Sequence, residues 1–199
     1  MTRTEQGDAT KARVVEVATR LFAEQGFQDV AIPDILEAAG VSRGALYHHF
    51  ESKEALFEIV LEAAEERLAV ELLAASAGRA DPVDSLRAGC ETFIRLAREP
   101  VIRQVLLADA LAVVGWAKWR EIDNRYGFGL MKAAVQAISP QADIPPAAVD
   151  AVAHMLLASV MELALLVAES DEKDAVQRAT AALELMLRRL LEPPGKKRG

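Results

Sequence analysis

The sequence predicts an all-α fold. Alanine, leucine and glutamate are abundant throughout the 199 residues, and glycine and proline interrupt the chain at intervals that suit helix ends. The sequence contains no run of alternating apolar and polar residues bounded by turn residues, so strands are not expected. The composition, 52% hydrophobic and 27% charged, is that of a globular protein rather than a disordered one.

Three helices are expected near the N-terminus, over residues 10–24, 32–39 and 43–49. The first carries one apolar stripe at helical spacing, formed by Val14, Ala18, Leu21 and Phe22. The second tolerates Pro33 because this proline lies in the first turn, and Gly40 closes it. Ser42 is the expected N-cap of the third helix.

A long fourth helix follows, over residues 53–74, with Ser52 as its cap. Further helices are expected over 84–98, 101–113, 116–138, 147–168 and 173–191, with breaks near Pro100, Gly115 and Pro140. We expect an N-terminal domain at residues 1–55, a second helical domain at 56–192 and a disordered tail at 193–199. The first two would share the fourth helix.

The charge and cysteine content restrict the class of protein. The net charge is −7, and residues 1–55 carry six Lys or Arg against nine Asp or Glu, so a basic domain is excluded. The single cysteine, Cys90, cannot form an internal disulfide, which favours a reducing compartment. The polar N-terminus lacks the apolar core of a signal peptide, and the apolar stretch 155–168 is short and interrupted by Glu162. A cytoplasmic protein with no membrane partner is expected.

The stretch "GVSRGALYHHFESK" at residues 40–53 is the most informative. Two short helices joined by a turn that contains glycine are typical of a helix-turn-helix, whose second helix lies in the DNA major groove. Arg43, at the start of that helix, can pair with two acceptors of guanine, and Gly44 permits close approach. Tyr47 and His48 can reach phosphates or a thymine methyl group, and Lys53 opens the next helix where a phosphate is favoured.

Residues 10–60 closely resemble the DNA-binding domain of the TetR/AcrR family of bacterial transcriptional regulators. The matching positions include Leu21–Phe22, Gly26–Phe27, the "AAGVS" at 38–42, Leu46–Tyr47, His49–Phe50 and the "SKE" at 52–54. The resemblance implies a homodimer, a palindromic operator in double-stranded DNA and repression released by a small ligand. Ala31 departs from the pattern, because members of the family commonly have a serine or threonine there that caps the second helix. The expected DNA-binding residues are Ala31, Ser42, Arg43, Gly44, Tyr47, His48, His49 and Lys53.

The two most apolar helices, 147–168 and 173–191, are expected to form the dimer. The second has an apolar face of Val176, Ala179, Ala182 or Leu183, Met186 and Leu190. A four-helix bundle with two helices from each protomer would bury both helices. The alternative is that both helices pack into a monomeric core.

An effector pocket is expected among the middle helices, where the segment 115–134 concentrates aromatic residues in a chain that is 5% aromatic. The candidate lining residues are Phe93, Trp119, Tyr126, Met131, His154, Met155 and Met161. An apolar ligand bound there would move the fourth helix as a lever and separate the two recognition helices. Alternatively, these residues simply fill the core, and Trp116 and Trp119 lie at the dimer edge.

The sequence does not support an enzyme. It contains no phosphate-binding loop, zinc-protease, nucleophile-elbow or Rossmann motif. No cofactor is expected, and no metal site either, because His48 and His49 have no further Cys or His nearby. Two other hypotheses remain open: a regulator of the same fold that senses no small molecule or activates transcription, and a helical interaction module that binds a protein partner. Salt-sensitive affinity for duplex DNA separates DNA-binding regulators from an interaction module.

Overall fold

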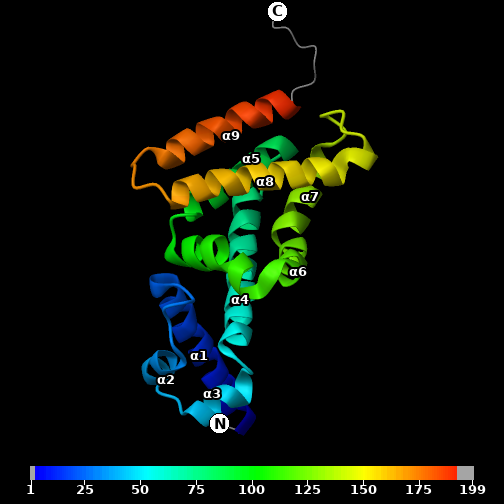
Figure 1. The fold of residues 1–199 in the computed structure, drawn as a ribbon. Coiled ribbons are helices and arrows are strands. Elements are labelled where there is room, and N and C mark those ends of the chain that lie inside the picture. The colour runs from blue at the N-terminus through cyan, green and yellow to red at the C-terminus, as the bar shows by residue number, and fades with distance from the viewer. Residues whose placement is uncertain (1–2, 192–199) are drawn as a thin grey trace, which may run out of the picture. The chain divides into compact units, whose positions relative to one another are not determined.

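The computed structural model describes residues 3–191, so the predicted tail 193–199 lies outside it. The helices, labelled in Figure 1, are α1 (Arg3–Gln25), α2 (Ile32–Ala39), α3 (Arg43–His49), α4 (Lys53–Ser76), α5 (Pro82–Leu96), η1 (Val101–Asp109), α6 (Ala110–Arg125), α7 (Gly127–Ile138), η2 (Pro146–Ala148), α8 (Val149–Ala168) and α9 (Ala175–Leu191). No strand occurs among these residues, and the predicted all-α fold is confirmed.

Helices α2 and α3 have the predicted bounds, and the differences lie elsewhere. Helix α1 begins at Arg3, earlier than predicted. The segment predicted as one helix over 116–138 is divided at Tyr126, whose backbone is not helical. The predicted break at Gly115 is present as a kink with φ 75° within α6. The segment 101–113 begins as a nine-residue π-helix, η1, instead of an α-helix.

The chain folds into two compact units. The first contains residues up to Glu65 together with Glu99–Arg120, and the second contains Glu66–Arg98 together with the residues from Glu121 onward. These units differ from the predicted domains 1–55 and 56–192, because the first half of α4 and the segment Glu99–Arg120 pack with the N-terminal helices. Two of the three divisions fall within α4 and α6, so both helices contribute residues to both units, and the third falls between Arg98 and Glu99, after α5.

An aromatic cluster forms the centre of the first unit. Phe22 of α1, Phe27 of the following turn and Phe57 of α4 lie with ring centroids 5.2–5.6 Å apart, two of the three pairs being edge-to-face. This separation is favourable for aromatic pairs. Apolar side chains from every helix of the unit complete the core, among them Val14, Ile35, Leu46, Phe50, Leu56 and Val105.

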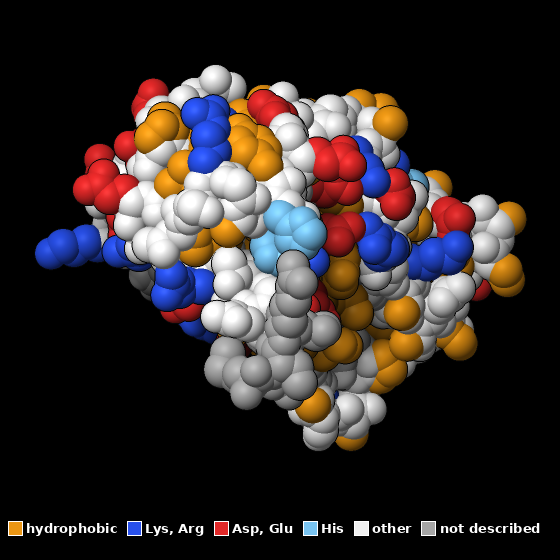
Figure 2. All heavy atoms as spheres, turned by 90° about the horizontal axis from the view of Figure 1, so that it is seen from below, with side chains coloured by type: hydrophobic (Ala, Val, Ile, Leu, Met, Phe, Trp, Pro, Cys, Tyr) orange, Lys and Arg blue, Asp and Glu red, His pale blue; other side chains and the backbone are white. Residues whose placement is uncertain are grey.

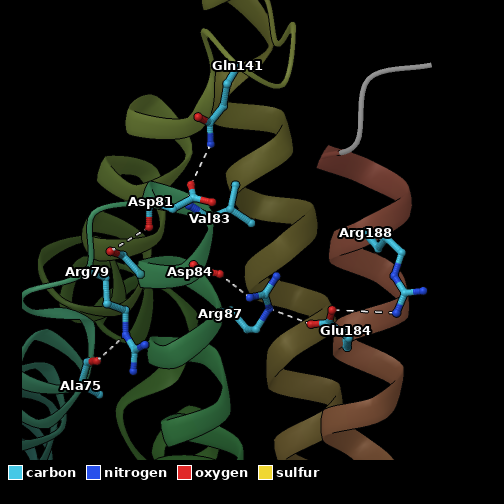
Figure 3. Close-up of polar contacts among 10 residues, drawn as sticks. Ala75, Arg79, Asp81, Val83, Asp84, Arg87, Gln141, Glu184 and Arg188 are labelled. Atoms are coloured by element: carbon cyan, nitrogen blue, oxygen red, sulfur yellow. Dashed lines mark hydrogen bonds and ion pairs between the residues drawn. The ribbon is translucent and has the colours of Figure 1, made fainter. Parts of the chain in front are cut away.

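The second unit packs α5, α7, α8 and α9 against one another. The buried face of α9 consists of Ala175, Ala179, Leu183, Leu187 and Leu191, a stripe displaced by about one residue from the predicted one. A polar network joins α5 to α9 (Figure 3): Arg87 pairs with Asp84, and its Nε lies 2.7 Å from Oε2 of Glu184. Asp81 caps α5 by accepting a hydrogen bond from Val83 N–H at 3.0 Å.

The apolar segment that contains α8 is longer than the stretch 155–168 that the sequence singled out. By length and composition, the segment Pro146–Ala168 is sufficient to cross a membrane, whereas the stretch 155–168 was expected to be too short. Core helices of proteins without a membrane pass the same test, and one face of α8 is buried through Val149, Ala153, Leu156, Val160, Ala164 and Val167. Its opposite face exposes Met155 and Leu166, which are 64% and 55% accessible to solvent.

Cys90 lies in the core of the second unit, and we expect it to be chemically inert in the folded chain. Burial, assisted by the nearby Glu91 carboxylate, raises the pKa of its thiol from 9.0 to about 12. The reactive form is the thiolate, so a thiol reagent at pH 8 should label the native protein far more slowly than the urea-unfolded chain. Equal labelling rates in the two states would contradict this expectation.

The same pKa shift gives the pH dependence of stability. The unfolded thiol ionises above pH 9 while the folded thiol keeps its proton, so the free energy of unfolding should fall as the pH rises from 9 toward 12. Urea titrations of the wild type and Cys90→Ala across this range measure the contribution of Cys90 as the difference between the two slopes.

Candidate nucleic-acid interface

The helix-turn-helix is built by backbone capping and a buried anchor. Gly40 ends α2 with φ 61°, a left-handed conformation that glycine adopts without strain, and Val41 N–H donates to Leu36 O at 3.1 Å. Ser42 is the N-cap of α3, as predicted, and its Oγ accepts a hydrogen bond from Ala45 N–H at 3.2 Å. Leu46 is fully buried and fixes the rotation of α3, so the opposite side of this short helix faces outward.

The outward side carries most of the residues that the sequence singled out. Ser42, Arg43, Gly44, Tyr47 and His48 are all exposed. The Arg43 guanidinium carbon lies 5.6 Å from the centroid of the Tyr47 ring, a cation–π distance, and Tyr47 is 42% accessible. Nothing lies within 4 Å of the position that a Cβ on Gly44 would occupy. The glycine is therefore not required by packing inside the first unit.

The two histidines differ in their surroundings. His48 is exposed, whereas His49 is half-buried and faces α1, where a Cβ added to Gly7 would lie 3.8 Å from its Cε1. Their rings are in edge-to-face contact, with centroids 5.1 Å apart. Over the described part of the chain, no group of three or more His, Cys, Asp or Glu could hold a metal ion. His48 is thus the histidine available to an external partner.

The N-terminus of α2 is not open in the way that the sequence suggested. Ala31 is among the expected DNA-binding residues, but its backbone N–H donates to Oδ2 of Asp34 at 2.9 Å. The carboxylate also occupies the positive end of the helix dipole. An approaching phosphate would have to displace or neutralise Asp34. The spacing of an acidic residue three positions after the cap could have indicated this contact.

Lys53 also has contacts that the sequence did not reveal. Its Nζ donates to the carbonyl oxygens of Phe27 and Val30, at 2.8 and 2.9 Å, and lies 4.1 Å from the centroid of the Phe27 ring. The same end of α4 carries Glu54, whose carboxyl pKa is lowered by its own backbone N–H and by the Ser52 hydroxyl. Lys53 therefore holds the turn between α1 and α2, and its predicted phosphate contact remains a prediction.

Arg13 was missed at the sequence level. Its Nη2 donates to Gly40 O at 3.1 Å, so α1 supports the turn between α2 and α3 directly. A Cβ at Gly40 would lie 3.3 Å from the same nitrogen, which gives this glycine a second role besides its backbone conformation. The contact joins residues 27 positions apart, so no local sequence pattern predicts it.

Charge is mixed on the face of the molecule that carries histidine side chains. Figure 2 shows Lys and Arg side chains interspersed with Asp and Glu on this face, without a continuous basic patch. This distribution agrees with the net charge of −3 for residues 1–55. Affinity for DNA would depend on a few well-placed groups rather than on bulk attraction.

The residues proposed for an effector pocket are divided between the two compact units. Trp119 belongs to the first unit, where it stacks on Trp116 with centroids 5.4 Å apart. The other six lie in the second unit: Phe93 and Met131 are buried, Tyr126 and Met161 are half-buried, and His154 and Met155 are exposed. His154 stacks on Phe128, with centroids 4.0 Å apart. The effector pocket at these seven residues stays a prediction.

Substitution of Gly44 by alanine tests whether α3 approaches another molecule closely. Because the added methyl group meets no protein atom, Gly44→Ala should stabilise the fold by about 0.5–1 kcal/mol through helix propensity. The same methyl group should weaken binding to duplex DNA if α3 enters a groove. Thermal unfolding and fluorescence anisotropy with a labelled duplex measure the two effects. Unchanged DNA affinity in a more stable variant would exclude a close approach at Gly44.

Two family models match the chain. The model "Bacterial regulatory proteins, tetR family" matches residues 14–60, which contain the helix-turn-helix, and the model "Tetracyclin repressor-like, C-terminal domain" matches residues 83–190. Together they include most of the described helices.

Known relatives agree with these models. A TetR-family transcriptional regulator from Pectobacterium atrosepticum has a solved structure that is 30% identical, with a TM-score of 0.80 over 98% of this chain and 100% of that chain. The regulator AcrR of Shigella flexneri is 36% identical over 42% of this chain and 39% of its own length. A transcriptional repressor of Mycobacterium tuberculosis is 32% identical over 55% of this chain and 58% of its own length.

The matches to the two curated relatives therefore span only part of those proteins. All three relatives are transcriptional regulators and not enzymes, as the sequence led us to expect. The chain belongs to the TetR family of bacterial transcriptional regulators.

Proposed function

We propose that the protein is a homodimeric, sequence-specific repressor that binds a palindromic operator through α3 and is released by a small apolar ligand. The observation that carries the proposal is the exposed face of α3. Arg43 and Tyr47 point outward there beside Gly44, while Leu46 anchors the helix from behind. The alternative is a regulator of the same fold that senses no small molecule or acts through a protein partner.

Arg43 is the residue best suited to base recognition. It is exposed at the first position of α3, and its guanidinium can donate two hydrogen bonds to O6 and N7 of guanine. Its stacking on Tyr47 limits the conformations of a long side chain, which reduces the entropy lost on binding. Tyr47 then offers its hydroxyl to a phosphate.

Electrostatics alone cannot supply tight binding here. The carboxylates of Asp34 and Glu54 lie at the N-termini of α2 and α4, and the ammonium of Lys53 is bound to two carbonyls. Non-specific attraction to phosphates should therefore be weak. Two linked recognition helices compensate, because the second half-site binds as an intramolecular event.

The exposed apolar faces of α8 and α9 support a dimer. Leu166 of α8 and Leu185 of α9 are each 55% accessible, and Met155 is 64% accessible. Large apolar side chains exposed on two neighbouring helices are typical of a surface that a partner covers. A second copy with the same two helices would bury them in a four-helix bundle.

Release by a ligand requires two states with different affinity for DNA. A ligand bound in the second unit can alter α3 by way of α4 and α6, because both helices contribute residues to both units. Such a ligand shifts the equilibrium only through its different affinities for the two states. Ligand and operator should therefore weaken each other's binding by the same factor.

Selection of bound duplexes from a random DNA pool tests the proposed function. The wild type should enrich a palindrome with half-sites one helical turn or a multiple apart, roughly 34–36 Å. Arg43→Ala should relax the preference at particular base pairs by about 1–3 kcal/mol each, whereas Tyr47→Ala should weaken binding uniformly. Arg95→Ala, which removes an exposed arginine from α5 in the second unit, is the matched control and should not change the preference.

Enrichment of a sequence without two-fold symmetry would argue against the dimeric operator. Absence of any enrichment by a folded dimer at low salt would instead favour the protein-partner alternative. Run at two salt concentrations, the selection also shows how many phosphate contacts contribute. Each contact makes the slope of log K against log salt concentration more negative by roughly 0.9.

Charge placed on the exposed apolar face tests the dimer. Leu166→Glu should shift the protein from dimer to monomer in sedimentation velocity, because two carboxylates would be buried near the two-fold axis without partners. Gln136→Glu, an exposed change on α7, adds the same charge in the same unit and should leave the dimer intact. A Leu166→Glu variant that is still dimeric would place the interface elsewhere.

A further inference from the structure

We propose that Asp109 is a positioning residue for DNA recognition, because together with Lys53 it clamps the backbone at Phe27 and so fixes the start of α2. The inference rests on the proposed function, but it concerns a residue outside the helix-turn-helix. Asp109 is the last residue of η1 and lies 82 positions after Phe27. All of the residues involved belong to the first unit.

The first half of the clamp is a hydrogen bond to the carboxylate. Phe27 N–H donates to Oδ2 of Asp109 at 2.8 Å, in a partly buried position. Gly26, immediately before it, has φ 81°, and a Cβ there would lie 3.1 Å from Nε2 of Gln104 and 3.7 Å from Oδ2 of Asp109. The glycine thus permits both the turn and the approach of η1. Hydrogen bonds to charged groups are stronger than neutral ones, so this bond holds the turn firmly.

The second half of the clamp acts on the carbonyl side. Lys53 Nζ donates to Phe27 O at 2.8 Å and to Val30 O at 2.9 Å. Phe27 is therefore held by an anion at its N–H and by a cation at its C=O. Its ring is also packed between Phe22 and Phe57, so the residue has little freedom to move alone.

The clamp leads directly to the recognition helix. Val30 precedes Ala31, the N-cap of α2, and α2 leads through Gly40 and Ser42 into α3. A shift at residues 27–30 therefore moves the start of α2 and changes the angle at which α3 presents Arg43. Displacements of about 1 Å are sufficient to impair a preorganised site.

The position of Asp109 makes the clamp sensitive to the state of η1. A π-helix of nine residues is unusual, since π-helical turns normally occur singly and often at functional sites. Rewinding η1 as an α-helix would rotate Asp109 about the helix axis and withdraw it from Phe27. A second contact joins the segment Glu99–Arg120 to the N-terminal residues of the first unit. It is the ion pair from Lys118 Nζ to Oε1 of Glu58, at 3.0 Å, which links α6 to α4 beyond the kink at Gly115. Asp109 is thus placed to transmit a change in η1 to α2.

Three variants distinguish the effect of Asp109 on the position of the Phe27 backbone from the effects of lost charge and lost stability. Asp109→Ala removes the acceptor, Asp109→Asn retains one acceptor oxygen without the charge, and Asp29→Ala removes an exposed carboxylate from the same turn. Amide exchange at Phe27, measured by NMR, reports the clamp, and fluorescence anisotropy with the selected duplex reports operator affinity. Loss of a negative charge by itself favours DNA binding, so weaker binding cannot be attributed to charge.

We expect Asp109→Ala to accelerate exchange at Phe27 and to weaken operator binding by roughly tenfold or more. Asp109→Asn should retain most of the affinity, and Asp29→Ala should bind at least as well as the wild type. If Asp109→Ala does not fold, Asp109→Ser, whose hydroxyl is too short to reach Phe27, replaces it.

Two results would overturn the inference while the proposed function stands: unchanged exchange at Phe27, or faster exchange with an operator affinity equal to that of Asp29→Ala. A wild-type chain that selects no operator would overturn the proposed function, and the role of Asp109 in recognition with it.

Discussion

The packing of Phe22, Phe27 and Phe57 is the constraint on which the helix-turn-helix depends. These three rings join α1, the turn after it and α4 in one buried cluster. A helix of seven residues such as α3 is not stable in isolation, so its geometry comes entirely from its neighbours. Phe27 is also the residue whose backbone is held by Asp109 and Lys53. The apolar core and the polar contacts therefore fix the same point of the chain.

The distribution of charge explains how an acidic chain can present a DNA-binding surface. Several of its charged groups are used within the first unit: Asp34 caps α2, Lys53 holds the α1–α2 turn, and Arg13 supports the α2–α3 turn. These groups rigidify the scaffold at the expense of attraction to phosphate. Arg43, stacked on Tyr47, keeps its donors on the exposed side of α3. Specificity in such a design depends on geometry more than on net charge, so the fixed orientation of α3 matters especially.

The two compact units meet different physical demands. The first combines sequence-distant segments to position one short helix, and it includes an unusual π-helix and a kinked α6. The second is a helical assembly whose polar contacts, such as Arg87 with Glu184, pair α5 with α9 while apolar side chains on α8 and α9 stay exposed. Helices that are apolar on two sides gain most from a partner. This arrangement leaves the second unit suited to association and the first to recognition.

The sequence by itself determined the all-α class, the bounds of α2 and α3, the Ser42 cap and the exposed residues Ser42, Arg43, Gly44, Tyr47 and His48. These features depend on residues within one or two helical turns of each other, so local patterns specify them. Only the tertiary structure decided that Lys53 and the Ala31 N–H form internal hydrogen bonds and that His49 faces α1. It also decided that Trp119 belongs to the first unit and that η1 is a π-helix whose Asp109 contacts Phe27. The contacts of Arg13 with Gly40 and of Asp109 with Phe27 span 27 and 82 positions. Such contacts form because packing of the core brings the segments together, and neither hydrophobic periodicity nor a capping residue in the sequence predicts them.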